Sequence, residues 1–261
     1  MSLHQITKDH FDQYAATWHS KLKQHAFRER HRKVQKILKK LNPRAVLDIG
    51  CGTGDYAPLF NLRQVNYLGL DLSEKMIETA QKLYPAYAFS VGNGEALMQP
   101  ENAYDLILSI AVLEYLEDPH AHLKECARVT QKGGNSIIAV PNEDNIALKR
   151  EEFLIQKLKL LKSLKFLSNK KNEDKERGFI KDKRVQHKKY SIQTMKELGK
   201  IHGLELIDAK YAFLRLLPTF TENLLPLNEW IEKTFSYFWE KPLHNIARKN
   251  SNILICHFRK L

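Results

Sequence analysis

Three glycines and two aspartates are spaced in a way that suits binding of a positively charged nucleoside. The stretch LDIGCGTGDY at 47–56 places Asp48 ahead of Gly50, Gly52 and Gly54. A glycine-rich turn after a buried strand lets a ligand approach the main chain closely. A carboxylate at the end of that strand suits an ammonium group, whereas the GxGxxG loop of dinucleotide-binding proteins suits a diphosphate.

The second acid of this pattern is Asp71, at the end of the run VNYLGLD. It follows the first strand by about 20 residues, where an acid can accept hydrogen bonds from both hydroxyl groups of a ribose. An ammonium-bearing amino acid and a ribose, held across one crevice, describe S-adenosylmethionine (SAM). The sequence therefore indicates a SAM site where two neighbouring strands end.

The elements that must position these residues alternate between strands and helices. We expect buried strands over 45–50, 65–73, 86–93, 104–112 and 135–142. We expect helices over 55–62, over 73–84 with Ser73 as N-cap, and over 120–131, ended by Gly133 and Gly134. Residues 5–41 read as helical with a break, 191–203 as a capped helix, and 204–214 and 251–260 as strands. This alternation predicts a parallel sheet with helices on both faces.

Four motifs, in order, resemble those of the class I SAM-dependent methyltransferase family. They are VLDIGCGTG at 46–54, GLDLS at 69–73, GNGEAL at 92–97, and YDLILSIAVLEYLEDP at 104–119 with ARVTQKGG at 127–134. The resemblance runs from about Ala45 to Asn142 and more loosely to the end of the chain. It implies an α/β, Rossmann-like seven-stranded sheet of order 3-2-1-4-5-7-6 with strand 7 antiparallel. Helices would cover both faces, and a helical insertion would follow strand 5.

The resemblance also implies which residues bind SAM. The methionine end would be lined by Asp48, Gly50, Cys51 and Gly52, although Cys51 also reads as a small packing residue. Asp71 would hold the ribose and Leu72 would pack on the adenine. Asn93 stands where the family usually has an aspartate that accepts from the adenine amino group, and its carbonyl can still accept. The loop neighbours Gly94, Glu95 and Ala96 follow, and Ser109 would face the sulfonium.

The catalytic candidates are Glu114, Tyr115 and His187. AVLEYLEDP resembles the small-molecule branch of the family, including quinone-biosynthesis O-methyltransferases, which read VLEHV-x-DP. Glu114 matches that pattern, while Tyr115 stands where those enzymes have histidine. His187, in HKKYSIQTM, resembles the family's H-x-x-aromatic-S/T stretch, and a pKa near ~6.5 suits a general base. The plainer alternatives are a helix-start residue for Glu114 and a histidine in a basic loop for His187.

Other classes of site are disfavoured by what the sequence lacks. The residues after the fourth strand carry neither the Asn/Asp-Pro-Pro-aromatic tetrad of amino-methylating DNA enzymes nor the Pro-Cys of cytosine C5 methyltransferases. His120 and His122 are two apart, so on a helix they point in different directions, and we expect surface residues rather than a metal pair. The three cysteines are far apart and indicate neither a disulfide framework nor a zinc cluster.

The chain divides into four segments. They are a basic helical segment at 1–44, a SAM-binding core at 45–145, a basic amphipathic insertion at 146–190, and a completion of the core at 191–261 with an aromatic helical stretch at 221–248. The net charge is +12, and the insertion is the most basic part. Residues 146–168 read as one long helix. Its function has three alternative interpretations: a lid over the acceptor, a contact with an anionic membrane, or an RNA-binding face. A packed helix with a solvated face is the plain alternative.

We therefore expect SAM-dependent methylation of a small-molecule or lipid-like acceptor at oxygen. No apolar run reaches the roughly 18 residues of a membrane span, and the first residues lack the apolar core of a signal peptide. These features favour a cytoplasmic protein, with peripheral membrane contact as one reading of the insertion. An RNA methyltransferase and an inactive SAM-binding interaction protein are the alternatives, and nucleic acid is disfavoured as a partner by the missing motifs.

Overall fold

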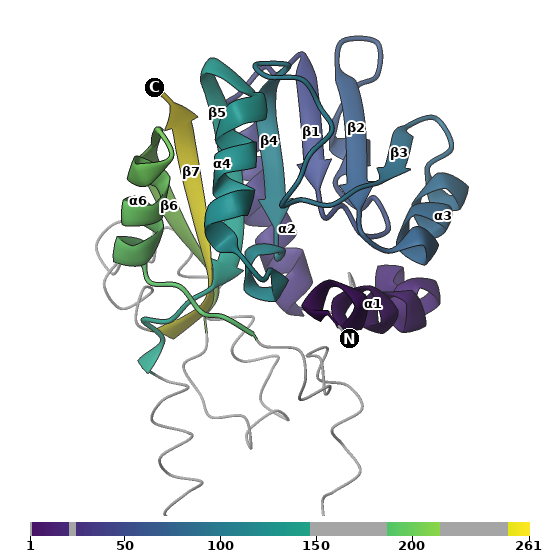
Figure 1. The fold of residues 1–261 in the computed structure, drawn as a ribbon, viewed down its shortest axis with the longest axis horizontal. Coiled ribbons are helices and arrows are strands. Elements are labelled where there is room, and N and C mark those ends of the chain that lie inside the picture. Colours follow the sequence, from purple (N-terminus) through teal and green to yellow (C-terminus); the bar gives the residue numbers. More distant parts are fainter. Residues whose placement is uncertain (1, 21–24, 147–186, 215–249) are drawn as a thin grey trace, which may run out of the picture.

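The computed structural model describes residues 2–20, 25–146, 187–214 and 250–261. Within them, seven strands form one sheet of order β3-β2-β1-β4-β5-β7-β6 (Figure 1), which confirms the expected order. The strands are β1 (Ala45–Ile49), β2 (Asn66–Asp71), β3 (Ala88–Val91), β4 (Tyr104–Ile110), β5 (Thr130–Pro141), β6 (Leu204–Leu214) and β7 (Ser251–Lys260).

Strands β1 to β5 are parallel, so their carboxyl ends meet at one edge of the sheet. Ile49 of β1 pairs with Leu70 of β2 on one side and with Ser109 of β4 on the other. The residues that follow these strands are therefore gathered at this edge. Strand β7 runs antiparallel to both β5 and β6, as the family resemblance implied.

Helices cover both faces of the sheet. On one face α2 (His25–Leu38) packs Val34 and Ile37 against Leu106 and Leu108 of β4. On the other face α4 (Pro119–Val129) packs against Ile107 of the same strand, and α6 (Ile192–Ile201) packs beside it (Figure 1). Because both faces are covered, the strands are apolar on both sides, which is typical of a parallel sheet.

Helix α1 (Leu3–Trp18) lies across the carboxyl edge of the sheet rather than on a face, close to α3 (Glu74–Leu83) (Figure 1). The expected break between residues 5 and 41 is confirmed by the separation of α1 from α2. The Ser73 cap is also confirmed, since its hydroxyl oxygen accepts from the N–H of Met76 at 3.1 Å. Ser191 caps α6 in the same way.

Two expected helix boundaries are wrong. The helix expected over 55–62 is a single 3-10 turn, η2 (Ala57–Leu59). Helix α4 ends at Val129, ahead of Gly133 and Gly134, because Thr130 already belongs to β5. Gly133 has a φ of +75°, which favours glycine, and the nearby register of β4 and β5 shifts between Tyr104 and Leu106. Gly133 and Gly134 therefore lie at an irregularity in the pairing of β4 and β5 and not at the end of the helix.

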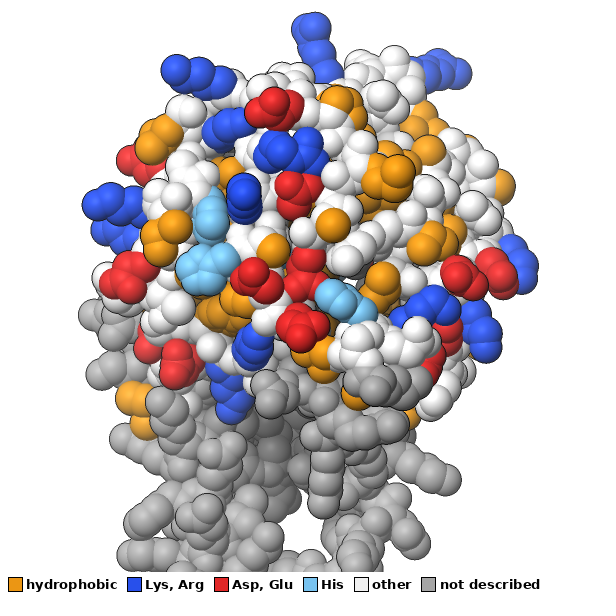
Figure 2. Space-filling model, in the orientation of Figure 1, with side chains coloured by type: hydrophobic (Ala, Val, Ile, Leu, Met, Phe, Trp, Pro, Cys, Tyr) orange, Lys and Arg blue, Asp and Glu red, His pale blue; other side chains and the backbone are white. Residues whose placement is uncertain are grey.

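Residues 147–186, which hold nearly all of the expected insertion, and the aromatic stretch at 221–248 lie outside the described residues. The described residues carry 22 basic and 20 acidic side chains. Most of the +12 net charge therefore belongs to the rest of the chain. On the face seen in Figure 2, Lys and Arg are interspersed with Asp and Glu. Among the described helices, none has the length and apolar character needed to span a membrane.

Candidate functional site

A cavity of about 220 Å³ lies at the carboxyl edge of the sheet, beneath α1. The loops after β1, β2, β3 and β4 form its floor, and α1, α2, the end of β5 and the start of β7 contribute to its walls. It is lined by many of the residues that the sequence singled out: Gly50, Cys51, Gly52, Asp71, Leu72, Asn93, Gly94, Glu114 and Tyr115. The structure therefore brings seven of the eleven expected cofactor residues and two of the three catalytic candidates to one place.

The Asp71 carboxylate is held by main-chain N–H groups. Gly52 donates to its Oδ2 atom at 2.9 Å, and Ser73 donates to Oδ1 at 2.9 Å. Burial raises the pKa of Asp71 to about 6, although these N–H groups act to lower it. Each carboxylate oxygen can accept a second hydrogen bond, so the group can still accept from a pair of hydroxyl groups.

The glycine spacing of the first motif has a steric cause. Gly50 and Gly52 have φ values of +68° and +55°, in the left-handed region that side chains rarely adopt. A Cβ atom at Gly50 would clash with the side chain of Val112, and one at Gly52 would lie 3.3 Å from Nε1 of Trp18. Side chains at these positions would therefore fill the space between the loop and the walls around it.

Two expected cofactor residues, Asp48 and Ser109, do not line the cavity. Asp48 is 1% exposed, and its Oδ2 accepts from the hydroxyl of Tyr67 at 2.8 Å. Burial raises the pKa of Asp48 to about 7, and the nearby carboxylate of Asp71 acts in the same direction. Ser109 is fully buried, with its Oγ atom 2.9 Å from Nε2 of His122. Both side chains point into the layers behind the sheet edge, so neither is part of the cavity lining.

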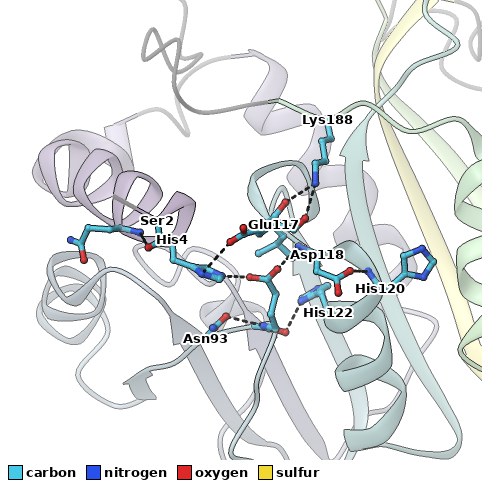
Figure 3. A network of polar contacts seen from close by, with 12 residues as sticks. Ser2, His4, Asn93, Glu117, Asp118, His120, His122 and Lys188 are labelled. Atoms are coloured by element: carbon cyan, nitrogen blue, oxygen red, sulfur yellow. Dashed lines mark hydrogen bonds and ion pairs between the residues drawn. The ribbon is translucent and has the colours of Figure 1, made fainter.

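Glu95 and Ala96 also lie outside the cavity lining. The Glu95 carboxylate binds His4 of α1 and accepts from the N–H of Asp118 at 2.6 Å (Figure 3). Asn93 does line the cavity, and its Oδ1 accepts from the N–H of Glu95 at 2.9 Å. Glu95 therefore connects the loop after β3 with α1 and with the start of α4.

Cys51 lines the cavity but is suited to packing rather than to nucleophilic chemistry. Burial raises the pKa of its thiol well above the usual range, and the Asp48 and Asp71 carboxylates reinforce this effect. The side chain therefore stays a neutral thiol. The plainer reading of Cys51 as a small packing residue agrees with these surroundings.

The expectation that His122 is a surface residue is wrong. It is fully buried on the side of α4 that faces the sheet, with Nδ1 2.8 Å from the carbonyl oxygen of Gly94. His120 is exposed, and its Nδ1 lies 3.2 Å from Nε2 of His202. Within the described part of the chain, no group of three or more His, Cys, Asp or Glu side chains could hold a metal ion.

Glu114 has an unusual environment for a carboxylate. It lies in the 3-10 turn η3 (Leu113–Tyr115) after β4 and is 4% exposed. Its Oε2 atom has no hydrogen-bond partner among the described residues. Burial raises its pKa to about 7, although the Arg30 guanidinium acts to lower it. Such a group can exchange a proton at neutral pH.

The other two catalytic candidates pack against each other. The rings of Tyr115 and His187 meet edge to face at a centroid distance of 4.8 Å. Burial raises the pKa of Tyr115 well above its ordinary value and lowers the pKa of His187. His187 is not among the cavity residues, whereas its neighbour Lys188 donates through Nζ to the carbonyl oxygens of Leu116 and Glu117 at 3.0 Å. His187 therefore contacts Tyr115 without lining the cavity itself.

The contribution of α1 and α2 to the cavity was not expected from the sequence. It consists of His4, Thr7, Phe11, Trp18, Ala26, Phe27 and Arg30. The α1 residues recur at positions 4, 7, 11 and 18, which is the spacing of one helix face. Phe11 contacts the ring of Tyr115 at a centroid distance of 5.2 Å and that of Trp18 at 5.3 Å. The aromatic spacing within 1–20 was the signal that could have found this wall.

The polar atoms of the cavity fit a ligand that both donates and accepts hydrogen bonds. Thr7 Oγ1, Arg30 Nε and Glu114 Oε2 are buried without a hydrogen-bond partner among the described residues, and all three side chains line the cavity. Buried polar groups in native proteins are almost always paired. SAM carries a carboxylate, an ammonium group, two ribose hydroxyls and an adenine, so its donors and acceptors suit these groups.

Sequence comparisons find methyltransferases. A family model described as a methyltransferase domain matches residues 47–138. A protein of Methanocaldococcus jannaschii is 33% identical over 162 residues, which are 61% of this chain and 73% of that protein. Trans-aconitate 2-methyltransferase of Methylobacterium radiotolerans is 36% identical over 107 residues, and demethylmenaquinone methyltransferase of Thermotoga maritima is 32% identical over 109. These two matches cover 40% and 48% of the relatives and 40% and 41% of this chain.

Solved structures share the fold of this chain. A methyltransferase in complex with the Haloferax volcanii Trm112 methyltransferase activator is 20% identical with a TM-score of 0.63, covering 97% of this chain and 96% of that one. Magnesium protoporphyrin IX methyltransferase of Synechocystis is 14% identical with a TM-score of 0.63 and full coverage of both chains. The family-model match and the methyltransferase relatives, together with the glycine loop and Asp71 at the sheet edge, establish that the chain belongs to the class I SAM-dependent methyltransferase family.

Proposed function

We propose that this methyltransferase transfers the methyl group of SAM to an oxygen atom of a small-molecule or lipid-like acceptor. The observation that supports it most is Glu114, a buried carboxyl in the cavity wall with an Oε2 that is unpartnered among the described residues and a pKa of about 7. A hydroxyl acceptor is most reactive when a base removes its proton, and a base with a pKa near the working pH is the most effective.

The residues proposed to hold SAM all line the cavity. When bound, SAM supplies the methyl group together with its own leaving group. Asp71 would accept hydrogen bonds from the ribose hydroxyls, while Leu72, Asn93 and Gly94 would border the adenine. Arg30 lines the same cavity with an Nε that no described residue pairs, so it is the natural partner for the carboxylate of the methionine part.

The residues proposed to bind the acceptor are Glu114 and the aromatic side chains around it. Phe11, Trp18, Phe27 and Tyr115 line the cavity, and their rings suit a largely apolar molecule. They would also exclude water and hold the acceptor oxygen close to Glu114, which would take up its proton. Two relatives are named for small organic acceptors, demethylmenaquinone and trans-aconitate, and this agrees with the proposed class.

A lipid-like acceptor is also compatible with the sequence of the insertion. The amphipathic helix expected over residues 146–168 would suit contact with an anionic membrane, in which such an acceptor would dissolve. RNA is the rival acceptor because the whole chain carries a net charge of +12. The described residues, with 22 basic and 20 acidic side chains, contribute little of that excess.

The test of this proposal uses SAM labelled on its methyl group. Purified protein would be incubated with labelled SAM and an extract of the source cells, and the products would be separated into organic-soluble, small polar, RNA and protein fractions. We expect the label in the organic-soluble or small polar fraction, as a base-labile ester or a stable ether. Label in RNA would contradict the proposed acceptor, and the absence of label from every fraction would favour an inactive SAM-binding protein.

A further inference from the structure

The buried side chain of His122 connects two walls of the cavity from behind. It is fully buried on α4 and does not line the cavity itself. On one side it reaches Gly94 in the loop after β3, and on the other it reaches Ser109 near the end of β4. Gly94 lies beside the proposed adenine position, and Ser109 precedes the turn that carries Glu114.

The hydrogen bonds of His122 determine which ring nitrogen carries the proton. The carbonyl oxygen of Gly94 can only accept, so Nδ1 at 2.8 Å must be the donor. Burial lowers the pKa of His122, which keeps the ring neutral and leaves Nε2 free to accept from the Ser109 hydroxyl at 2.9 Å. Sγ of Cys126 is also near Nε2, at 3.5 Å. One neutral tautomer thus satisfies both partners.

The loop after β3 packs directly against the imidazole ring of His122. A Cβ atom added at Gly94 would lie 3.0 Å from Nδ1 of His122 and 2.9 Å from Cγ2 of Ile49. On the other side of the loop, Glu95 is held by His4 and by the N–H of Asp118 (Figure 3). Among the described residues, His122 is therefore the side chain that fixes the Gly94 carbonyl.

We propose that His122 is a positioning residue for the cofactor: by donating to the Gly94 carbonyl, it holds the loop after β3 where its main chain can meet the adenine of SAM. The inference rests on the proposed location of SAM in this cavity. The effect on SAM affinity comes from the hydrogen bond that Nδ1 donates, while the contact of Nε2 with Ser109 holds the ring itself in place. Neither contact involves SAM, so His122 would act only through the loop.

Two isosteric substitutions separate the two hydrogen bonds. In His122→Asn, the side-chain amide can occupy the place of Nδ1 and donate to Gly94, whereas in His122→Gln the longer amide can occupy the place of Nε2 and accept from Ser109. His122→Leu removes both. Cys126→Ala is the matched control, because it opens space beside the same ring and leaves the Gly94 contact in place.

The measurement is the Kd of SAM by calorimetry, together with the melting temperature of each variant without ligand. We expect His122→Gln and His122→Leu to weaken SAM binding at least about 10-fold, as loss of a buried hydrogen bond allows. His122→Asn should stay close to wild type, and Cys126→Ala should lower the melting temperature without changing the Kd.

Equal affinities in all folded variants, or equal losses in the Asn and Gln variants, would overturn the assignment even if the Leu variant failed to fold. A loss of affinity in Cys126→Ala as large as that in His122→Gln would also overturn it. Wild-type protein that does not bind SAM would instead overturn the proposed function, so the two failures can be told apart.

Discussion

The main-chain N–H of Gly52 lies 2.9 Å from Oδ2 of Asp71, so the glycine loop after β1 is bonded directly to the acid that ends β2. The other oxygen of the same carboxylate accepts from the N–H of Ser73 at the start of α3. Two loops and a helix terminus are therefore joined through one side chain. The carboxylate is fixed in orientation before a ligand arrives, which lowers the entropy lost on binding.

Replacement of this carboxylate should remove most of the affinity for SAM. In Asp71→Ala, both N–H groups lose their acceptor and the ribose hydroxyls lose theirs. We expect the Kd of SAM to rise about 100-fold, as loss of charge-assisted hydrogen bonds implies, measured by calorimetry. The matched control is Asp105→Ala, because Asp105 accepts from the N–H groups of Arg44 and Ala45 at the opposite end of β1. That variant should lose stability and keep its affinity; an unchanged Kd in Asp71→Ala would remove Asp71 from the site.

Glu114 should control the pH dependence of methyl transfer. Its pKa is raised to about 7, and a base acts only after losing its proton, so the rate should rise with pH through about 7. Glu114→Gln should lower turnover by about 10²- to 10³-fold, with a flat pH profile and an unchanged Kd for SAM. The control is Glu117→Gln, since that side chain is largely exposed. If Glu114→Gln keeps both the rate and its pH dependence, Glu114 is excluded as the base.

The buried Asp48 should make the protein less stable as pH rises. The folded protein keeps the Asp48 proton up to a pH of about 7, whereas the unfolded chain loses it near the ordinary pKa of 3.8. Between these values the folded state binds more protons, so this group lowers the free energy of unfolding with increasing pH. Asp48→Asn should therefore be more stable than wild type by about 1–3 kcal/mol at pH 8, with a smaller difference at pH 5.

Urea unfolding at the two pH values measures this effect. Tyr67→Phe is an informative companion, because it removes the hydroxyl that donates to Asp48 at 2.8 Å. It should raise the pKa of Asp48 further and lower stability mainly at pH 8. Equal stability of wild type and Asp48→Asn at pH 8 would show that the buried carboxyl is not strained in its ionised form.

Arg30 should recognise the carboxylate of SAM. In Arg30→Gln the Kd of SAM should rise about 10-fold, as loss of a charge-assisted bond implies. Binding of 5′-methylthioadenosine, which lacks the amino-acid part, should not change. The control is Arg32→Gln on the same helix, since Arg32 pairs with Glu29 at 2.7 Å. Equal weakening of both ligands, or a change only in the KM of the acceptor, would show that Arg30 serves another part of the cavity.

Much of the fold was predictable because its signals are local. A buried strand ending in glycine, followed by a second strand ending in an acid, is sufficient to place Gly50, Gly52 and Asp71 at one sheet edge. The family motifs then supplied the strand order, including the antiparallel β7. Ser73 and Ser191 marked helix starts through their capping hydroxyls, which depend only on neighbouring residues.

The errors concern the direction of side chains and contacts between distant segments. In a sheet buried on both faces, an apolar run does not show which side each residue faces, so Asp48 and Ser109 were expected to line the cofactor site but lie behind the cavity lining. His122 was expected at the surface, because two neighbouring histidines on a helix do not reveal which one faces the sheet. The α1 wall was missed because its docking depends on Glu95 and Ser73, which are distant in sequence.

The position of α1 has a kinetic consequence. Asp12 of this helix accepts hydrogen bonds from the Ser73 hydroxyl and the N–H of Lys75, while Phe11 packs on Tyr115. A nucleoside bound beneath α1 would exchange with solvent more readily when these contacts open. Its residence time would then report the local opening of one helix rather than global unfolding. Amide hydrogen exchange across Leu3–Trp18, compared with and without S-adenosylhomocysteine, measures that opening before any acceptor is identified.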